Sequence, residues 1–296
     1  MENASILDIK QFDKFENQDD FYASIFSKHL VNHHNAISVP HKHNFYFAVL
    51  FTQGSGFHEI DFERFEVQRG SIFLINPGQT HYWKLSSDIE GFIFFHTETF
   101  YNFNFAQNAL STYPFFYTTQ NSPYLLLTEG LTQNISIRFQ EVLFEYESEK
   151  MYKSRKIISL IDSLYIDLSR IYLEQNTGVV HKTNMYSEKL KQLEFLIDLN
   201  FKIEKSPVQY ASWMNMTSKH LNRIVQNSVG KTTSTMIIER VLLEAKRLLS
   251  NSHKNINEIA EDLGFEEQGY FSRTFKKITG ETPSEFKSRY SSIKDA

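Results

Sequence analysis

The feature that most constrains this chain is a pattern of two short helices joined by a tight glycine turn. It lies in the stretch INEIAEDLGFEEQGYFSRTFKKITGETPSEF, residues 256–286. Just ahead of it, Asn255 is placed to form a capping box with Glu258 and so to open a helix. Gly264 supplies the left-handed conformation that ends that helix. The apolar residues between these points recur at helical spacing: Ile256, Ile259, Ala260 and Leu263.

A second helix is predicted from about Glu267 to Ile278, closed by Gly280 in the same way. Its apolar side comprises Phe271, Phe275 and Ile278. A third helix begins at TPSE, with these predicted roles: Thr282 as N-cap, Pro283 at the first and Glu285 at the third helical position. Two short helices joined by a tight turn form a helix-turn-helix, whose second helix lies in the DNA major groove.

If the phenylalanines face inward, the opposite side of the second helix carries residue types that contact DNA. Arginine forks onto guanine, glutamine onto adenine, and lysine meets phosphate. The predicted DNA-facing residues are Gln268, Gly269, Ser272, Arg273 and Lys276. This stretch alone also allows a solvated face on a structural helix pair, because helical hairpins are common.

The same pattern occurs about fifty residues earlier, in SPVQYASWMNMTSKHLNRIVQNSVGK. Thr217 is the predicted N-cap of this copy's second helix, and its outer face carries Ser218, Lys219, Asn222 and Arg223. Between the copies, STMIIERVLLEAKRLL, from Ser234 to Leu249, predicts one long helix. Two recognition helices on a rigid spacer can address successive turns of the major groove, which recur about every 34 Å. A duplicated motif therefore favours DNA binding over a purely structural role.

This tail, from about Ser187 to the last residue, resembles the AraC/XylS family of bacterial transcription regulators. The resemblance is concentrated in IAEDLGFEEQGYFSRTFKKITGETPSEF and RVLLEAKRLL. It implies two helix-turn-helix subdomains that bind adjacent major-groove segments on one DNA face, with base contacts from the outer-face residues named above. Two positions depart from the pattern. Glu267 stands where a small capping residue is usual, and Gly269 offers no side chain to a base.

The front half is aromatic and is predicted to form strands. From Pro40 to Phe95, short apolar runs such as FYFAVLF, SIFLI and GFIFF alternate with Gly, Pro and Asn, which is typical of an all-β sandwich or barrel. The phrase PHKHNFYF…GSG…RGSIFLINPGQTHYW resembles the cupin-like effector domain of sugar-responsive members of the same family. We therefore expect a two-domain α+β chain. Residues 1–178 form the effector and dimerisation domain, 187–296 form the all-α DNA-binding domain, and QNTGVVHKTN, 175–184, is the predicted linker.

Three histidines of the front half allow two interpretations. His41, His43 and His81 lie where cupin enzymes place metal ligands, and neutral imidazoles suit iron, nickel or zinc. The usual carboxylate is missing, since Phe47 and Ala48 stand in its place. We therefore expect an organic pocket, with no metal and no cofactor. The predicted effector-binding residues are His41, His43, Tyr46, His81, Tyr82 and Trp83. The alternative for each aromatic ring is core packing, and the alternative for the whole chain is a cupin-type metalloenzyme with an appended DNA-binding domain.

The helical region that follows contains an apolar seam with spacings of 4, 3, 4 and 3 residues, which suits a partner helix. Its residues are Ile157, Ile161, Leu164, Leu168 and Ile171. We expect these residues to form a dimer interface. The same spacing also fits a contact between this helix and the β-domain, which remains the alternative.

Composition and charge exclude several classes of protein. The absence of cysteine excludes disulfides, thiolate metal sites and a cysteine nucleophile, and with them the alkyl-transfer repair proteins that share this tail. The longest apolar run has seven residues, far short of the roughly 20 that cross a bilayer, and the acidic start is unlike a signal peptide. From Glu188 onward 17 basic residues face 14 acidic ones, while the preceding 187 residues carry 14 against 21. A mildly basic tail is suited to meet a polyanion.

The sequence thus predicts a sequence-specific, DNA-binding transcription regulator and not an enzyme. Its control is expected from a small-molecule effector, a sugar or a similar polar metabolite. The expected partners are double-stranded promoter DNA, the effector, a second copy of the chain and RNA polymerase. The expected location is the cytoplasm, without contact to a membrane.

Overall fold

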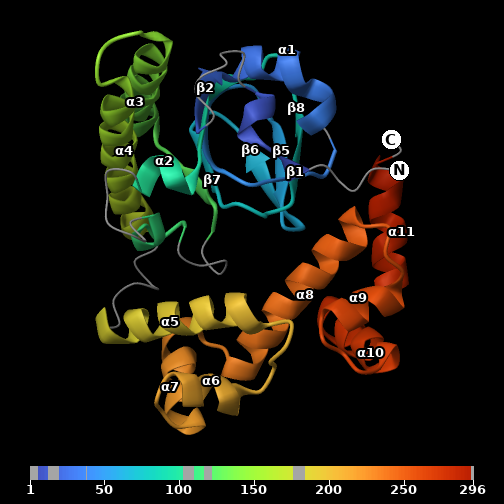
Figure 1. Ribbon diagram of the computed structural model, residues 1–296. Helices are drawn as coiled ribbons and strands as arrows, with labels where there is room; N and C mark the ends of the chain where they lie inside the picture. Colours follow the sequence, from blue (N-terminus) through green and yellow to red (C-terminus); the bar gives the residue numbers. More distant parts are fainter. Residues whose placement is uncertain are drawn as a thin grey trace. The chain divides into compact units, whose positions relative to one another are not determined.

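In the computed structural model of the chain, the described residues are 6–12, 20–37, 39–102, 110–116, 122–175 and 184–294. They fall into two compact units, one ending at Gln175 and the other beginning with the helix at Asn184. Residues 176–183 of the predicted linker lie outside the described residues, so the linker stays a prediction. Figure 1 shows both units, and each is described by itself.

The first unit is a β-sandwich with a layer of helices. Its larger sheet has the strand order β10-β7-β4-β9-β2, its smaller sheet has the order β6-β5-β8, and β1 pairs with β3. The strands are β1 Ile6–Leu7, β2 Phe21–Ile25, β3 Lys42–His43, β4 Tyr46–Gln53, β5 Gly56–Ile60, β6 Glu63–Val67, β7 Ser71–Ile75, β8 His81–Leu85, β9 Glu90–His96 and β10 Tyr124–Leu126. The helices are η1 Ile9–Gln11, α1 Phe26–Ile37, α2 Glu98–Asn102, η2 Leu110–Thr112, α3 Glu129–Glu147 and α4 Lys153–Gln175. The predicted sandwich is confirmed.

Strand β4 shows why the run FYFAVLF is apolar without alternation. Phe47, Val49 and Phe51 belong to the core between the two sheets. Ala48 and Leu50 belong to a second core, which the larger sheet shares with α3 and α4. A strand that is covered on both faces needs apolar residues at every position. Residue parity along the central strands therefore decides which of the two cores a side chain enters.

Helix α4 turns its apolar seam toward its own sheet. Ile157, Ile161, Leu164, Leu168 and Ile171 are all buried in the core that α3, α4 and the larger sheet share. Figure 1 shows α3 and α4 side by side along this unit. The prediction that these five residues form a dimer interface is corrected, because side chains enclosed within the unit cannot contact a partner helix. The alternative reading, contact with the β-domain, is the observed one.

The second unit consists of seven helices in its described residues. They are α5 Asn184–Asn200, α6 Pro207–Trp213, α7 Ser218–Val229, α8 Thr233–Asn251, α9 Ile256–Asp262, α10 Gln268–Thr279 and α11 Pro283–Lys294. Helices α6 and α7 form the first predicted motif, α9 and α10 form the second, and α8 is the predicted spacer between them. No helix among the described residues is long and apolar enough to cross a membrane.

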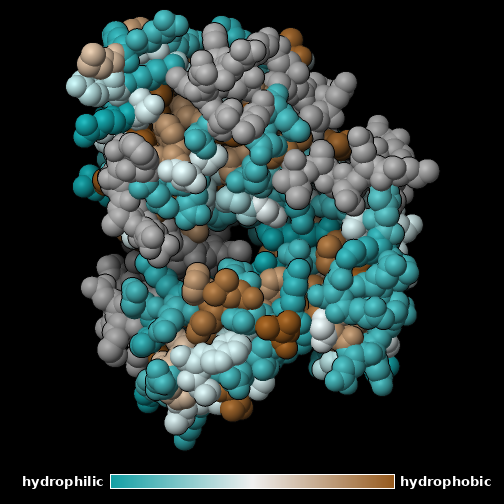
Figure 2. All heavy atoms as spheres, in the orientation of Figure 1, coloured by the Kyte–Doolittle hydropathy of each residue, from teal (hydrophilic) through white to brown (hydrophobic). Residues whose placement is uncertain are grey.

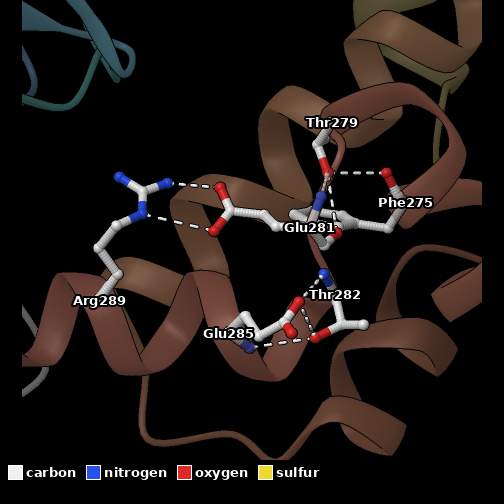
Figure 3. Close-up of polar contacts among 6 residues, drawn as sticks. All are labelled: Phe275, Thr279, Glu281, Thr282, Glu285 and Arg289. Carbon is white, nitrogen blue, oxygen red and sulfur yellow. Dashed lines mark hydrogen bonds and ion pairs between the residues drawn. The ribbon is translucent and has the colours of Figure 1, made fainter.

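The predicted helix ends of the second motif are confirmed. Asn255 and Glu258 form the capping box of α9, and Gly264 has a φ of 70°. Figure 3 shows the start of α11, where the backbone N–H of Thr282 donates to Glu285 Oε2 at 2.7 Å and the backbone N–H of Glu285 donates to Thr282 Oγ1 at 3.2 Å. One detail is corrected. Ile278 is 48% exposed, because the core ends one turn earlier at Phe275.

Candidate DNA interface and effector pocket

The two helix-turn-helix motifs have the same turn geometry. In the first, the backbone N–H of Met216 donates to the carbonyl of Ala211 at 3.0 Å. In the second, the N–H of Phe265 donates to the carbonyl of Ala260 at 2.9 Å. These partners are equivalent positions of the repeat, 49 residues apart. The duplication predicted from sequence thus extends to individual backbone hydrogen bonds.

The outer face of α10 is exposed as predicted. Phe271 and Phe275 are fully buried, while the opposite side of the helix faces solvent. The exposed residues are Gln268, Gly269, Arg273 and Lys276, and Ser272 is half-buried. In Figure 2 the visible surface of this second motif is mostly hydrophilic. These side chains are therefore free to approach a DNA groove.

Gly269 and Glu267, the two departures from the expected pattern, have visible consequences at the start of α10. A Cβ on Gly269 would lie 3.3 Å from Nη1 of Arg273, so the missing side chain leaves room for the guanidinium. Glu267 is the N-cap residue but makes no side-chain capping hydrogen bond. Its carboxylate lies at the positive end of the helix dipole, where negative charge is favourable.

On the outer face of α7, all the predicted DNA-facing side chains are at least partly exposed, and two of them also make hydrogen bonds within the unit. Lys219 and Arg223 are exposed, and Ser218 is half-buried. Nη2 of Arg223 donates to Nδ1 of His220 at 2.9 Å. Asn222 is exposed, but its Oδ1 accepts the backbone N–H of Thr233, the first residue of α8, at 3.0 Å. Bidentate recognition of adenine uses both polar atoms of an asparagine, so Asn222 is better placed to anchor α8 than to contact a base.

A groove beside Gln268 was not predicted from the sequence. It has a volume of about 680 Å³ and is lined mostly by polar residues, from the N-cap and first turn of α9, from the start of α10 and from α11. The other lining residues are Asn255, Ile256, Asn257, Ser284, Lys287 and Ser288. Asn255, Ile256 and Asn257 lie at the start of α9 and the other three residues belong to α11, so only the packing of these helices shows that they line one groove. The groove extends the exposed polar surface from α10 to α11.

The first unit holds a small cavity that is lined by residues of both sheets, the N-terminal segment and α1. Its volume is about 10 Å³, the space of roughly one water molecule. Four of the six predicted effector residues are among its lining, namely His41, His43, His81 and Trp83. The rest of the lining comes from Leu7, Phe12, His29, Phe45, Phe47 and Phe95. The structure thus brings the three predicted histidines together, and adds residues of the N-terminal segment over them.

Four buried polar atoms around this cavity have no hydrogen-bond partner among the described residues. They are His43 Nε2, His58 Nδ1, His81 Nε2 and Trp83 Nε1. His58 was missed in the sequence analysis. It pairs with Trp83 across β5 and β8, and its Nε2 lies 2.9 Å from His81 Nδ1. A buried polar atom without a partner costs free energy, so four such atoms in one place indicate a site that is completed by something else.

Burial keeps the histidines of this cluster neutral. It lowers the pKa of His41 to about 4 and that of His43 to about 3. It also lowers the pKa values of His58 and His81 well below the ordinary value of 6.5. Nδ1 of His43 lies 2.7 Å from the carbonyl of Phe45 and must carry the proton, because a carbonyl only accepts. Nε2 of His43 is therefore an unpaired acceptor.

Tyr46 and Tyr82, the other two predicted effector residues, lie outside the cavity. Tyr46 packs on the helical side of the larger sheet, stacked on His96 with ring centres 5.5 Å apart. Tyr82 points away from the sandwich interior and donates to Glu59 Oε2 at 3.1 Å. Both have the parity opposite to that of the cavity residues on their strands. Their assignment to the pocket is corrected on this ground.

The three-histidine metal site was the alternative interpretation of this region. The ring centres of His41 and His81 are 4.2 Å apart, and those of His43 and His81 are 5.1 Å apart. Among the residues that the structure describes, no group of three or more His, Asp or Glu side chains is arranged so that it could hold a metal ion.

Known proteins resemble the chain in both units. Residues 28–119 match the AraC-like ligand binding domain, and residues 210–289 match a helix-turn-helix domain. The arabinose operon regulatory protein of Escherichia coli is 23% identical over 243 residues, which cover 82% of this chain and 80% of the relative. The transcriptional activator RhaR of Yersinia pseudotuberculosis is 25% identical over 267 residues, 85% of each chain. The solved structure of ToxT from Vibrio cholerae matches with a TM-score of 0.44 at 13% identity, over 90% of this chain and 98% of that one.

A sandwich with a ligand-binding match, followed by two helix-turn-helix motifs on one spacer helix, defines a DNA-binding transcription regulator with an effector-binding domain. The chain belongs to the AraC/XylS family of such regulators.

Proposed function

We propose that the cavity around His43, His81 and Trp83 binds a small polar metabolite, and that this ligand controls DNA binding by the second unit. One observation carries the proposal: in the unit that matches a ligand-binding domain, three lining residues of the cavity and the adjoining His58 each have a buried polar atom without a partner. The name of one relative, the arabinose operon regulatory protein, supports a sugar as the class of ligand.

The unpaired atoms define the chemistry of the ligand. His43 Nε2 is an acceptor, and Trp83 Nε1 carries a hydrogen and is a donor. In the neutral pair of His58 and His81, one ring donates to the other. Whichever ring donates, His58 Nδ1 and His81 Nε2 together present one further donor and one further acceptor. A ligand with several hydroxyl groups matches two donors and two acceptors, because each hydroxyl can both donate and accept.

The ligand cannot enter without a rearrangement, since about 10 Å³ holds only one water molecule. Leu7 and Phe12 cover one side of the cavity. The segment that carries them is paired with the sandwich by the two-residue bridge of β1 to β3 and by hydrogen bonds of Asn44 to Leu7 and Asp8. The pairing of β1 with β3 is shorter than the pairing of β4 with β7 and β9, so we expect this segment to move when the ligand binds.

A calorimetric screen of the full chain against sugars, sugar acids and polyols tests the pocket. A ligand that binds in this cavity should lose affinity about tenfold or more on Trp83→Phe, which removes the N–H donor and also shortens the ring system. Tyr82→Phe is the matched control, because it removes one hydroxyl from the outer side of the same strand. A ligand whose affinity changes equally in both variants binds elsewhere.

For the DNA-binding unit, we propose that α7 and α10 contact bases and that the groove beside Gln268 contacts the DNA backbone. The exposed side chains of Arg223 and Arg273 are the proposed base contacts. Lys287 and the hydroxyls of Ser284 and Ser288 line the groove and are of the types that bind phosphate. Lys287→Ala should weaken binding to every DNA sequence by a similar factor and lower the salt dependence. A sequence-dependent loss would contradict this assignment.

We also propose that the chain acts as a homodimer through the outer face of α3 and α4, with RNA polymerase as a further partner at the promoter. Four large apolar residues remain exposed there at seven-residue spacing along each helix: Ile137 and Phe144 on α3, Ile166 and Leu173 on α4. Their exposed fractions range from 37% to 67%. Such a stripe is suited to a helix from a second copy.

A further inference from the structure

A second connection besides α8 joins the two helix-turn-helix motifs. Lys205 lies in the turn between α5 and α6, next to the first motif. Its Nζ donates to the carbonyl of Gly264, in the turn of the second motif, at 3.1 Å. The same Nζ donates to the carbonyl of Lys202 at 3.1 Å and lies 5.1 Å from the centre of the Phe265 ring. One ammonium group therefore ties the turn of the second motif to the segment that leads into the first.

The backbones of the two segments are also in direct contact at Gly264. A Cβ at this position would lie 1.9 Å from the carbonyl oxygen of Lys202 and 2.9 Å from Nζ of Lys205. The equivalent residue of the first motif is Asn215, which has a φ of 53° and carries a side chain. At Gly230 and Gly280, which end the two recognition helices, a Cβ would meet nothing within 4 Å. Gly264 thus differs from Gly230 and Gly280, because its missing side chain allows the backbone of Lys202 to come close as well as allowing the turn.

The segment that receives this contact is itself fixed to the spacer helix. Nε of Arg240 on α8 donates to Asp198 Oδ1 on α5 at 2.6 Å, and the guanidinium of Arg240 lies 4.0 Å from the centre of the Phe201 ring. Oε1 of Glu204 accepts the backbone N–H groups of Lys205 and Ser206 at 2.8 and 2.7 Å. The turn from 201 to 206 is therefore held on one side by α8 and on the other by the second motif.

We propose that the contact of Lys205 and Lys202 with Gly264, here called the brace, fixes the separation and orientation of α7 and α10. The chain then accepts only DNA sites in which the two contacted segments have one spacing. This inference rests on the proposed binding of both motifs to DNA. A single helix between two motifs can bend, whereas a second contact away from its axis removes that freedom. Lys205 and Gly264 are thus positioning residues that do not touch DNA themselves.

The geometry can be measured without DNA, because the chain has no cysteine. Asn227→Cys on α7 and Lys277→Cys on α10 place spin labels at equivalent, exposed positions of the repeat. Double electron–electron resonance is recorded on labelled full chain diluted with unlabelled chain, so that only distances within one chain are seen. We expect a narrow distance distribution that broadens in Lys205→Met and shifts or broadens in Gly264→Ala. Lys202→Met is the matched control, since only its carbonyl takes part in the brace. Equal distributions in all four proteins would overturn the proposal.

The second measurement is spacing selectivity on a duplex selected from a random library by the wild-type chain. Adding or removing one base pair between the two contacted segments should lower wild-type affinity by about tenfold or more. In Lys205→Met the same change should cost about threefold or less, while Lys202→Met keeps the wild-type preference. An unchanged preference in both Lys205→Met and Gly264→Ala overturns the proposal. If the wild-type chain selects no duplex, the DNA-binding proposal fails, and the label distances still decide whether the brace exists.

Discussion

Arg223 in α7 and Arg273 in α10 occupy the same position of the repeat, and each guanidinium lies against the preceding turn of its own helix. Arg223 Nη2 donates to Nδ1 of His220 at 2.9 Å, and Arg273 Nη1 lies 3.3 Å from the place of a Cβ on Gly269. Both side chains point along the exposed faces of the two predicted recognition helices.

Substituting either arginine should therefore weaken specific DNA binding. We expect Arg223→Ala and Arg273→Ala each to lower the free energy of binding to a selected duplex by about 1–3 kcal/mol, with little effect on non-specific DNA. Arg155→Ala is the control, because it removes the same charge from an exposed position of the first unit. Fluorescence anisotropy titrations measure all three. Wild-type affinity in both recognition-helix variants would mean that α7 and α10 do not contact bases.

The order of α4's residues predicts opposite outcomes for two neighbouring positions. Leu164 is completely buried, so Leu164→Ala should lower the free energy of unfolding by about 2–5 kcal/mol. Ile166 is 39% exposed on the stripe proposed as the dimer interface. Ile166→Asp should leave the free energy of unfolding nearly unchanged and shift the sedimentation coefficient toward that of a monomer. A dimer that survives Ile166→Asp and Phe144→Asp does not use this face.

The buried histidines predict a stability that falls in mild acid. Their pKa values in the folded protein, about 4 for His41 and about 3 for His43, lie below the ordinary 6.5. Between these values the unfolded chain binds more protons, so the free energy of unfolding decreases as the pH falls below about 6.5. The loss at pH 5 should be on the order of 2 kcal/mol for each histidine.

Urea titrations at pH 7.5 and pH 5 measure this effect. At pH 5 most carboxylates are still ionised, so their titration does not add to the effect. Glu129 is an example, because hydrogen bonds from Arg69 lower its pKa to about 2. His43→Asn keeps a donor for the carbonyl of Phe45 but cannot titrate, so the difference between the two pH values should shrink in this variant. An equal difference in wild type and His43→Asn would show that His43 does not stay neutral on folding.

Substitutions in the cavity should remove the response to the ligand, whereas substitutions on the outer face of the same strand should not. His81→Ala removes an unpaired acceptor or donor from the cavity, and we expect it to abolish the effect of the ligand on DNA affinity while DNA binding without ligand stays near wild type. Tyr82→Phe, one residue along the same strand, should keep the full response. A full response in both His81→Ala and Trp83→Ala would place the effector site elsewhere.

Local signals along the sequence were sufficient to predict the DNA-binding unit almost residue by residue. Caps at Asn255 and Thr282 and the left-handed Gly264 each fix a helix end within a few residues, and the repeat supplied an independent check. Local sequence signals could not predict contacts between segments that are distant in the sequence. The bond from Asn222 to Thr233 and the approach of Lys202 to Gly264 depend on how the helices pack.

In the first unit, the strands were predicted but the direction of their side chains was not. Alternation in GFHEI places His58 inside with Trp83, and the same rule places Tyr82 outside. Applying it would have exchanged Tyr82 for His58 in the pocket. The seam of α4 is different in kind, because spacing of 4 and 3 residues is the same for a helix on a sheet and a helix on a partner. Only the packing of Leu164 distinguishes them.

The most direct test of a ligand-controlled regulator is the DNA affinity of the full chain, measured with and without a ligand that binds the histidine cavity. Linkage requires that DNA change the ligand's affinity by the same factor as the ligand changes that of DNA, typically about 5–150-fold. We predict a change in this range in anisotropy titrations of the selected duplex, with an equal factor in calorimetric titrations of the ligand. A ligand that saturates the cavity and leaves DNA affinity unchanged would contradict control of the second unit by the first.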